Sequence, residues 1–283
     1  MNSKKHAVKL VTILVAFFAV IIFPINSYAD HDWNNYHWAR RSNPFTLKVV
    51  DSTTSSWASY QNTALSDWSQ SSVMNLASEQ GNESSSSRRN CTMIAGKIRS
   101  CNYTYGSNGW LGLASINITG GVHITQGSSK MNDTYFNTST YNNPNERLHV
   151  MCQELGHTFG LTHTSENGSS QNTCMDYFSN TGANATSTLS TRPNQHDYDM
   201  LASIYAHLDS TTTIGSVISG LAASEITNEP NSWGRLTSQS ANGRSSTYKR
   251  EHYDGSETAT HVFWTEEAAE RCRGCDHRYH DVQ

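Results

Sequence analysis

The sequence predicts an α+β fold, in which β-strands and helices share one core. Residues 45–50, 73–77 and 109–136 have the composition or the alternation of strands. Residues 55–69 and 145–156 instead have the features of helices. Their order along the chain predicts a sheet that packs against helices.

The first predicted strand and helix follow each other closely. Residues 45–50 come after Pro44 and are rich in apolar and β-branched side chains. In residues 55–69 the apolar side chains recur at helical spacing, which is typical of a face that packs on the core. These side chains are Trp57, Tyr60, Ala64, Leu65 and Trp68. Residues 109–136 alternate well enough for two strands around Gly120-Gly121.

The start of the helix at residues 145–156 is marked by its capping residues. Asn143 is an expected N-cap, Pro144 fits the first helical position, and Glu146 stands three residues after the cap, as in a capping box. A later helix is expected from Asn194 to about residue 207.

The helix at 145–156 leads into a motif that carries chemistry. The chain reads Q-E-L-G-H-T-F-G-L-T-H over residues 153–163. Side chains four apart on a helix are offset by only ~40°, so Gln153 and His157 point to a common spot with Glu154 beside them. Gly160 can take a positive φ, end the helix and bring His163 back as a further ligand.

These residues fit metal-assisted hydrolysis. Imidazole nitrogens are preferred zinc ligands, and zinc lowers the pKa of water toward ~7. Glu154 can then take a proton from the attacking water and pass it to a leaving amine.

Glu154, His157, Gly160 and His163, with Met175 beyond them, resemble the metzincin clan of zinc endopeptidases. The resemblance is specific over residues 148–177 and loose elsewhere. It implies a five-stranded mixed, twisted sheet over an active-site helix, with a small C-terminal lower subdomain after Gly160.

The resemblance also implies roles for single residues. Met175 matches the methionine of the Met-turn, which forms a hydrophobic floor beneath the metal. Tyr177 matches a tyrosine that helps to hold the oxyanion. Residues 109–136 lie where the clan has an edge strand antiparallel to the substrate, and an unpaired edge can bind an extended peptide. A plain surface hairpin is the alternative there.

Gln153 departs from the pattern, because the clan has a histidine at that position. Three interpretations follow. The amide oxygen of Gln153 binds zinc directly; another histidine, such as His123 or His196, completes the site; or metal binds weakly or not at all. His149 is eight residues from His157, about 12 Å along a straight helix, so both cannot bind one ion.

The N-terminus indicates export. Lys4, Lys5 and Lys9 precede an apolar run at residues 10–23, and small residues stand near Ala29. The sequence therefore predicts a signal peptide at 1–29, a catalytic domain at 30–209 and a C-terminal appendix at 210–283, possibly a small β module. The apolar run is shorter than a membrane span, so an uncleaved anchor is the weaker alternative.

Composition agrees with a secreted or periplasmic protein. Without residues 1–29 the chain has 17 basic and 24 acidic residues, a net charge of −7, which argues against a nucleic-acid partner. Six cysteines in an exported chain indicate disulfides. Cys91 and Cys101 are close in sequence and are expected to form one of them.

The other four cysteines leave alternatives. In a metzincin-like fold Cys152 and Cys174 come close, so the resemblance implies a bridge between them. Cys272 and Cys275 predict either a small terminal disulfide or, with His277 and His280, a metal or redox site.

The predicted function is that of a secreted zinc metalloendopeptidase. Its metal ligands are Gln153, His157 and His163, its catalytic residues are Glu154 and Tyr177, and its partner is a protein or peptide substrate in extended conformation. There are two competing classes. One is a non-catalytic peptide-binding protein that does not bind a metal ion tightly, and the other is a thiol-redox protein.

Overall fold

The computed structural model describes residues 31–217 and 229–279. The predicted signal peptide at 1–29 and His280 lie outside these residues. Among the helices within them, none has the length and apolar character that crossing a bilayer requires.

A mixed β-sheet forms the centre of the molecule, as the sequence predicts. Eight of its nine strands run in the order β3-β2-β4-β6-β5-β9-β8-β7, and β1 pairs with β6. The strands are β1 (His37–Trp38), β2 (Phe45–Ser52), β3 (Met74–Gln80), β4 (Ile98–Tyr103), β5 (Trp110–Thr119), β6 (His123–Asn132), β7 (Arg235–Gln239), β8 (Ser245–Glu251) and β9 (Glu257–Trp264).

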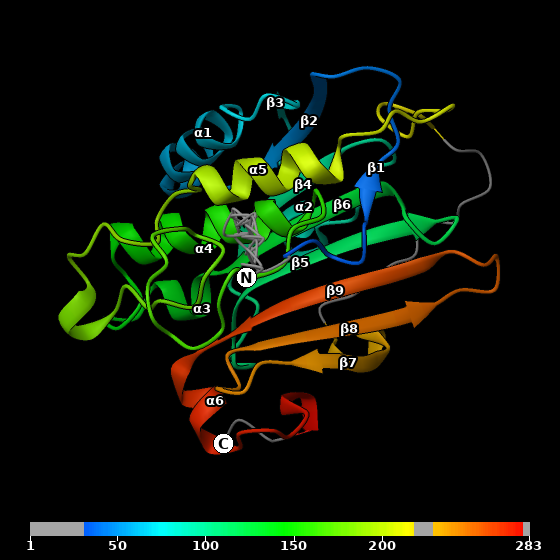
Figure 1. Ribbon diagram of the computed structural model, residues 1–283. Coiled ribbons are helices and arrows are strands. Elements are labelled where there is room, and N and C mark those ends of the chain that lie inside the picture. Colours follow the sequence, from blue (N-terminus) through cyan, green and yellow to red (C-terminus); the bar gives the residue numbers. More distant parts are fainter. Residues whose placement is uncertain (1–30, 218–228, 280–283) are drawn as a thin grey trace, which may run out of the picture.

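The helices are α1 (Ser55–Trp68), α2 (Ser85–Asn90), α3 (Asp133–Phe136), α4 (Pro144–His157), α5 (Gln195–Ile204) and α6 (Glu266–Arg271). Short 3-10 turns are η1 (Gly182–Asn184), η2 (Pro230–Trp233) and η3 (His277–Tyr279). Figure 1 shows α1, α4 and α5 gathered together above β5 and β9. Helix α4 packs against α1 and against strands β5 and β6.

The predicted N-cap and first residue of α4 are confirmed, whereas the predicted capping box is wrong, because the Glu146 carboxylate bonds to Asn180 and not to the Asn143 N–H. The Asn143 side chain accepts a hydrogen bond from the Glu146 N–H, and Pro144 is the first helical residue. Oε2 of the buried Glu146 accepts from the N–H of Asn180, so this carboxylate ties the helix start to the loop after residues 153–163. Asn194 caps α5 with a full capping box through Asp197.

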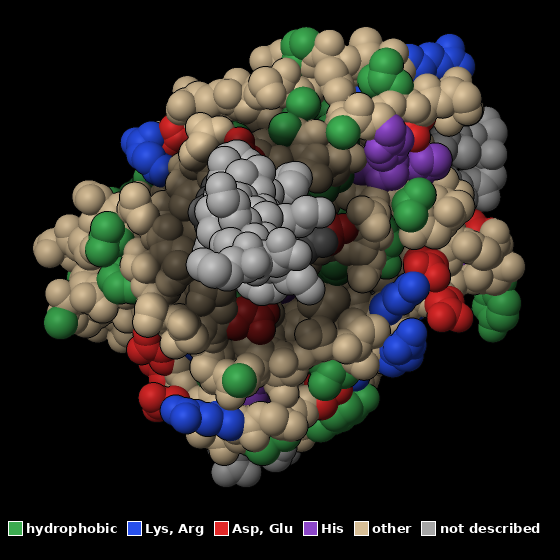
Figure 2. Space-filling model, viewed as in Figure 1, with side chains coloured by type: hydrophobic (Ala, Val, Ile, Leu, Met, Phe, Trp, Pro, Cys, Tyr) green, Lys and Arg blue, Asp and Glu red, His purple; other side chains and the backbone are tan. Residues whose placement is uncertain are grey.

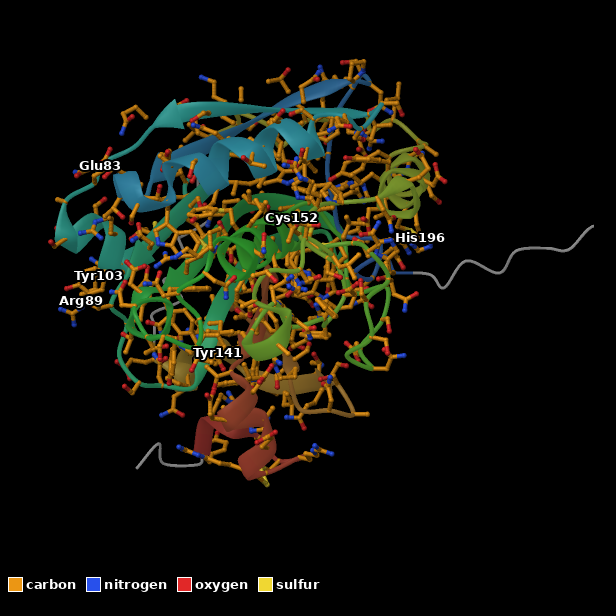
Figure 3. The ribbon with its side chains drawn as sticks, turned by 90° about the vertical axis from the view of Figure 1, so that its left-hand side faces the viewer. Glu83, Arg89, Tyr103, Tyr141, Cys152 and His196 are labelled. Atoms are coloured by element: carbon orange, nitrogen blue, oxygen red, sulfur yellow. A yellow bond between two sulfur atoms is a disulfide. The ribbon has the colours of Figure 1, made fainter. Side chains whose placement is uncertain are left out.

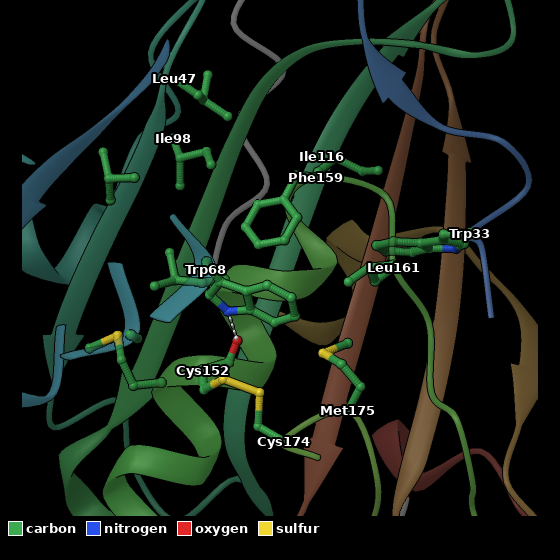
Figure 4. Packing of buried hydrophobic residues seen from close by; sticks show 14 of the residues in the cluster. Trp33, Leu47, Trp68, Ile98, Ile116, Cys152, Phe159, Leu161, Cys174 and Met175 are labelled. Atoms are coloured by element: carbon green, nitrogen blue, oxygen red, sulfur yellow. Dashed lines mark hydrogen bonds between the residues drawn. A yellow bond between two sulfur atoms is a disulfide. The ribbon is translucent and has the colours of Figure 1, made fainter. Parts of the chain in front are cut away.

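One large hydrophobic cluster lies between the sheet and α1, α4 and α5. Trp68, on the predicted core face of α1, donates its indole N–H to the Cys152 carbonyl at 3.0 Å. Figure 4 shows this bond beside the disulfide between Cys152 and Cys174, with Met175 next to it. In Figure 3 Cys152 lies inside the molecule, whereas His196 of α5 lies toward its surface.

The C-terminal strands extend this sheet. Strand β9 pairs antiparallel with β5 from Ile118 to Trp110, and β8 and β7 follow it. The sheet is therefore wider than the five strands that the metzincin resemblance implies, because β9 pairs along the side of β5 that β6 leaves open. In Figure 1 these strands lie below β5.

The cysteines pair in three bridges. Cys91 is joined to Cys101, Cys152 to Cys174, and Cys272 to Cys275, with Cα–Cα distances of 6.0, 5.9 and 5.6 Å. These are the pairs that local spacing and the resemblance indicate. A bridge between Cys272 and Cys275 leaves no thiolate there to bind a metal.

Candidate metal centre

Helix α4 ends at His157, and the chain then turns back. Gly160 has φ 102°, and a Cβ at this position would collide with the Tyr36 carbonyl oxygen. The Leu161 N–H reaches back to the Gly156 carbonyl at 3.3 Å. This turn brings His163 beside His157, as the sequence predicts for Gly160.

The two imidazoles face each other through their Nε2 atoms, which lie 3.1 Å apart. Their Nδ1 atoms point outward to acceptors. Nδ1 of His157 lies 2.8 Å from the Leu161 carbonyl oxygen, and Nδ1 of His163 lies 3.2 Å from a carboxylate oxygen of Glu166. Such acceptors hold the proton on Nδ1, so each Nε2 presents a lone pair to the other.

Burial keeps these rings neutral. It lowers the pKa of His157 well below the ordinary value, and the neighbouring His163 lowers it further. Burial also lowers the pKa of His163. Two buried lone pairs at this distance repel unless a cation lies between them, and zinc prefers neutral imidazole nitrogen. The donor set therefore fits a divalent metal ion.

A third histidine, His261 of β9, completes the group. One ring nitrogen from each of His157, His163 and His261 lies within 4.8 Å of the others. The His261 ring centroid is 3.9 Å from that of His157 and 4.8 Å from that of His163. Burial lowers the pKa of His261 well below the ordinary value.

The sequence did not predict His261 as a member of this group. No spacing rule connects it to the helix motif. The available signal was indirect: the motif lacked one histidine, and a later strand carried a histidine among apolar residues, where a strand side chain is buried.

Gln153 makes different contacts. Its amide N–H₂ donates to the carbonyls of Cys174 at 2.9 Å and Asp176 at 2.8 Å. Its Oε1 is buried without a hydrogen-bond partner among the described residues. The side chain thus fastens helix α4 to the loop that contains Met175, and its role as a metal ligand stays a prediction.

His149 supports the same loop from one turn earlier. Its Nε2 lies 3.1 Å from the Asp176 carbonyl, and the residue is fully buried. It does not belong to the histidine group at His157, in agreement with the helical distance argument.

Glu154 and Tyr177 both contact His261. Oε2 of Glu154 lies 3.3 Å from Nδ1 of His261, and the Tyr177 hydroxyl lies 2.9 Å from its Nε2. Burial raises the pKa of Glu154 and that of Tyr177 well above their ordinary values. The tyrosine ring also packs on His163, with centroids 4.3 Å apart.

Met175 lies against the helix just before His157. A Cβ on Gly156 would come within 2.5 Å of the Met175 sulfur, so this glycine lets the methionine approach the helix backbone. Met175 is fully buried, and its carbonyl accepts from the Thr164 N–H at 2.8 Å. It therefore packs between the segments that carry His157 and His163.

A cleft of about 380 Å³ opens beside the three histidines. Its other walls come from the N-terminal segment, the loop after α4 and strands β7 and β8. The residues that line it are Asp32, Trp33, Asn34, His157, Thr162, His163, Glu166, Thr237, Ser238, Thr247 and His261. The three histidines thus line the cleft, whereas Glu154 and Tyr177 are not among its lining residues.

The other histidines considered from sequence lie elsewhere. His123 belongs to a separate group with His37 and Asp209, and His196 stacks on His31 with ring centroids 4.7 Å apart. His277 is buried, and its Nε2 contacts the Gly243 carbonyl at 2.9 Å.

No protein-family profile and no curated protein matches the sequence. Among solved structures, the chain resembles High choriolytic enzyme 1 (HCE-1), a hatching enzyme zinc-protease from Oryzias latipes (Medaka fish), with 11% sequence identity and a TM-score of 0.34. The match covers 60% of this chain and 94% of that one. A likeness of this extent carries no functional argument.

Proposed function

We propose that this protein is an exported zinc-dependent endopeptidase whose metal ligands are His157, His163 and His261. The observation that carries the proposal is the pair of buried Nε2 atoms 3.1 Å apart, each on a ring whose Nδ1 faces an acceptor. This arrangement is typical of ligating histidines. Gln153 remains the competing third ligand.

A bound zinc ion would supply Lewis acidity toward a peptide carbonyl and would make water acidic enough to act at neutral pH. Glu154 would serve as general base, because its carboxylate lies beside the ligand group and has one oxygen, Oε1, without a hydrogen-bond partner in the described part of the chain. A raised pKa suits a group that takes a proton and then returns it to the leaving amine.

Tyr177 would stabilise the oxyanion. Burial keeps its phenol protonated, since it raises the pKa well above the ordinary value. A protonated hydroxyl in a dry site donates a strong hydrogen bond to a developing negative charge. Its present contact is Nε2 of His261, which lies at the edge of the cleft.

The proposed partner is a protein or peptide substrate in extended conformation. The metzincin resemblance assigns an unpaired strand edge to the substrate. In this chain that edge of β5 is already paired with β9. Substrate would instead enter the cleft between Trp33 and the strands β7 and β8, near Thr237 and Thr247. Three disulfides fit an oxidising compartment, as an exported protein requires.

The test compares purified wild type with Glu154→Gln for zinc content and for cleavage of a casein-type substrate. If Glu154 is the base, zinc content stays unchanged while kcat falls by about 100-fold or more. If Glu154 only orients His261, zinc content falls together with activity. A wild type that neither binds zinc nor cleaves contradicts the proposal.

A non-catalytic binding protein is the second candidate. It is favoured by the complete burial of Glu154 and by β9 covering β5. This candidate predicts that peptides bind in the cleft without being cleaved, even in protein saturated with zinc.

A further inference from the structure

The disulfide between Cys272 and Cys275 differs from the other two bridges. It joins cysteines only 3 positions apart, whereas the separations in the other bridges are 10 and 22. Both of its cysteines are half-buried, whereas each of the other four is at most 2% exposed. A thiol from solvent can therefore reach this bridge more readily than either of the others.

The bridge lies at the end of helix α6, which follows strand β9. Cys272 is the C-cap of α6, and Gly274 turns the chain with φ 83° and with nothing within 4 Å of an added Cβ. Figure 1 shows α6 at the lower end of the molecule, and Figure 2 shows Lys and Arg side chains exposed at that end. Of the described residues from 265 onward apart from β9, none lines the cleft beside the three histidines.

His277 gives Cys275 a basic neighbour. Its Nδ1 lies 4.0 Å from Sγ of Cys275, and its Nε2 lies 2.9 Å from the Gly243 carbonyl oxygen. Because a carbonyl can only accept, the proton of the neutral ring is on Nε2, and Nδ1 presents its lone pair to the sulfur. This nitrogen can take the proton of a Cys275 thiol and hold the resulting thiolate as an ion pair.

Contacts other than the bridge hold Cys275 in place. Its carbonyl oxygen accepts a hydrogen bond from Nε2 of Gln239 at 2.7 Å. The neighbouring Asp276 carboxylate accepts from the Arg278 guanidinium at 2.6 Å, so the charge beside Cys275 is compensated. Cys275 should therefore stay beside His277 when the bridge opens, and the fold should not depend on the bridge.

We propose that Cys272 and Cys275 form a site of thiol–disulfide exchange with low-molecular-weight thiols of the glutathione class. A thiolate attacks Sγ of Cys272, the bond between the two cysteines breaks, and its electron pair leaves on Sγ of Cys275, beside His277. The sulfur that leaves is the one whose thiolate is better stabilised.

A second thiolate completes the exchange. It attacks the sulfur of the small thiol bound to Cys272, which releases Cys272 as a thiolate. The bridge has then gained two electrons, two small thiols have been oxidised to one disulfide, and their two protons end on the two cysteines. The same steps in reverse restore the bridge at the expense of a small disulfide.

The first test equilibrates the intact wild-type protein with mixtures of reduced and oxidised glutathione at neutral pH. Differential alkylation and mass spectrometry of peptides measure each bridge separately. The equilibrium constant for reduction is expected to be at least about 100-fold larger for Cys272–Cys275 than for Cys91–Cys101, which serves as the internal control. Equal resistance of the two bridges to reduction overturns the proposal.

A second test asks which sulfur His277 activates. The Cys272→Ser variant keeps Cys275 as a free thiol, and Cys275→Ser keeps Cys272. At pH 7 the thiol of Cys272→Ser should react with oxidised glutathione about 10-fold faster than that of Cys275→Ser. Adding His277→Gln, which keeps an amide donor but no basic nitrogen, should remove the difference. His252→Gln is the matched control and should leave it unchanged, whereas equal rates in the two single variants contradict the proposal.

The exchange site is independent of the proposed metal centre. The double variant Cys272→Ser/Cys275→Ser should keep the zinc content, casein cleavage and circular dichroism of wild type and lose only the exchange with glutathione. Failure of the endopeptidase proposal therefore leaves this one testable by itself. A double variant that is unfolded at neutral pH would make the bridge a structural one and overturn the proposal.

Discussion

Nδ1 of His261 lies 3.3 Å from Oε2 of Glu154, a residue 107 positions earlier in the chain. Both side chains are buried, and each comes from a different layer of the molecule: Glu154 from helix α4 and His261 from strand β9. The C-terminal strand is therefore part of the candidate site, and its sequence bears directly on metal binding.

Replacing His261 by alanine tests its role as ligand. Loss of one imidazole should weaken zinc binding at this site by more than about 100-fold, since even the loss of a residue that supports a ligand costs 10–100-fold. Proteolysis should fall with it, and both are measured by metal titration and casein cleavage. His252→Ala, in the turn before β9, serves as control. A gain of activity in His261→Ala would instead mean that β9 blocks the site.

The Gln153→Ala variant tests whether Gln153 is a metal ligand or only holds helix α4 against the loop that contains Met175. The amide donates two buried hydrogen bonds, to Cys174 and Asp176, so its loss should reduce the free energy of unfolding by about 2–4 kcal/mol. Zinc stoichiometry should persist in the folded variant, because three histidines remain. Loss of zinc from a variant that is still folded by circular dichroism would make Gln153 the ligand.

Gly160→Ala probes the turn that positions His163. Its φ of 102° and the nearby Tyr36 carbonyl both oppose a side chain, so the free energy of unfolding should fall by roughly 2–4 kcal/mol. Gly120→Ala is the matched control: φ is 60° there, nothing lies within 4 Å of the added Cβ, and about 1 kcal/mol is expected. Urea unfolding measures both, and equal losses would rule out the collision with Tyr36.

The buried Lys130 of β6 should make the stability of the fold depend on pH. Burial lowers its pKa to about 8 from the ordinary lysine value of 10.5. Between these values the unfolded chain holds the proton and the folded chain does not, so the free energy of unfolding should rise as pH increases from about 8 to 10.5.

Lys130→Met should remove that slope and, at pH 7, stabilise the fold by up to about 3 kcal/mol. Urea unfolding at pH 7, 8.5 and 10 measures the effect. Lys48→Met is the control, because the Lys48 side chain is 58% exposed and paired with Glu79. If Lys130→Met keeps the wild-type slope, another group titrates in this range.

Local features were predictable from sequence because they depend on neighbours along the chain. The predicted helix at 55–69 is α1 (Ser55–Trp68), and the capped helix at 145–156 is α4 (Pro144–His157). The Gly120-Gly121 turn joins β5 and β6, with φ of 60° and 80°. Capping, periodicity and glycine conformation are short-range properties, so the residues themselves fix them.

The completion of the candidate site was not predictable in the same way. Sequence spacing placed His157 and His163 together, because a helix end and one glycine turn decide their geometry. Nothing within the motif specifies which distant strand pairs with β5, and that pairing brings His261 beside Glu154. The local sequence thus determined helix α4 and the positions of His157 and His163 relative to each other. The position of the third histidine was decided only by long-range strand pairing, which is driven by burial of a shared core.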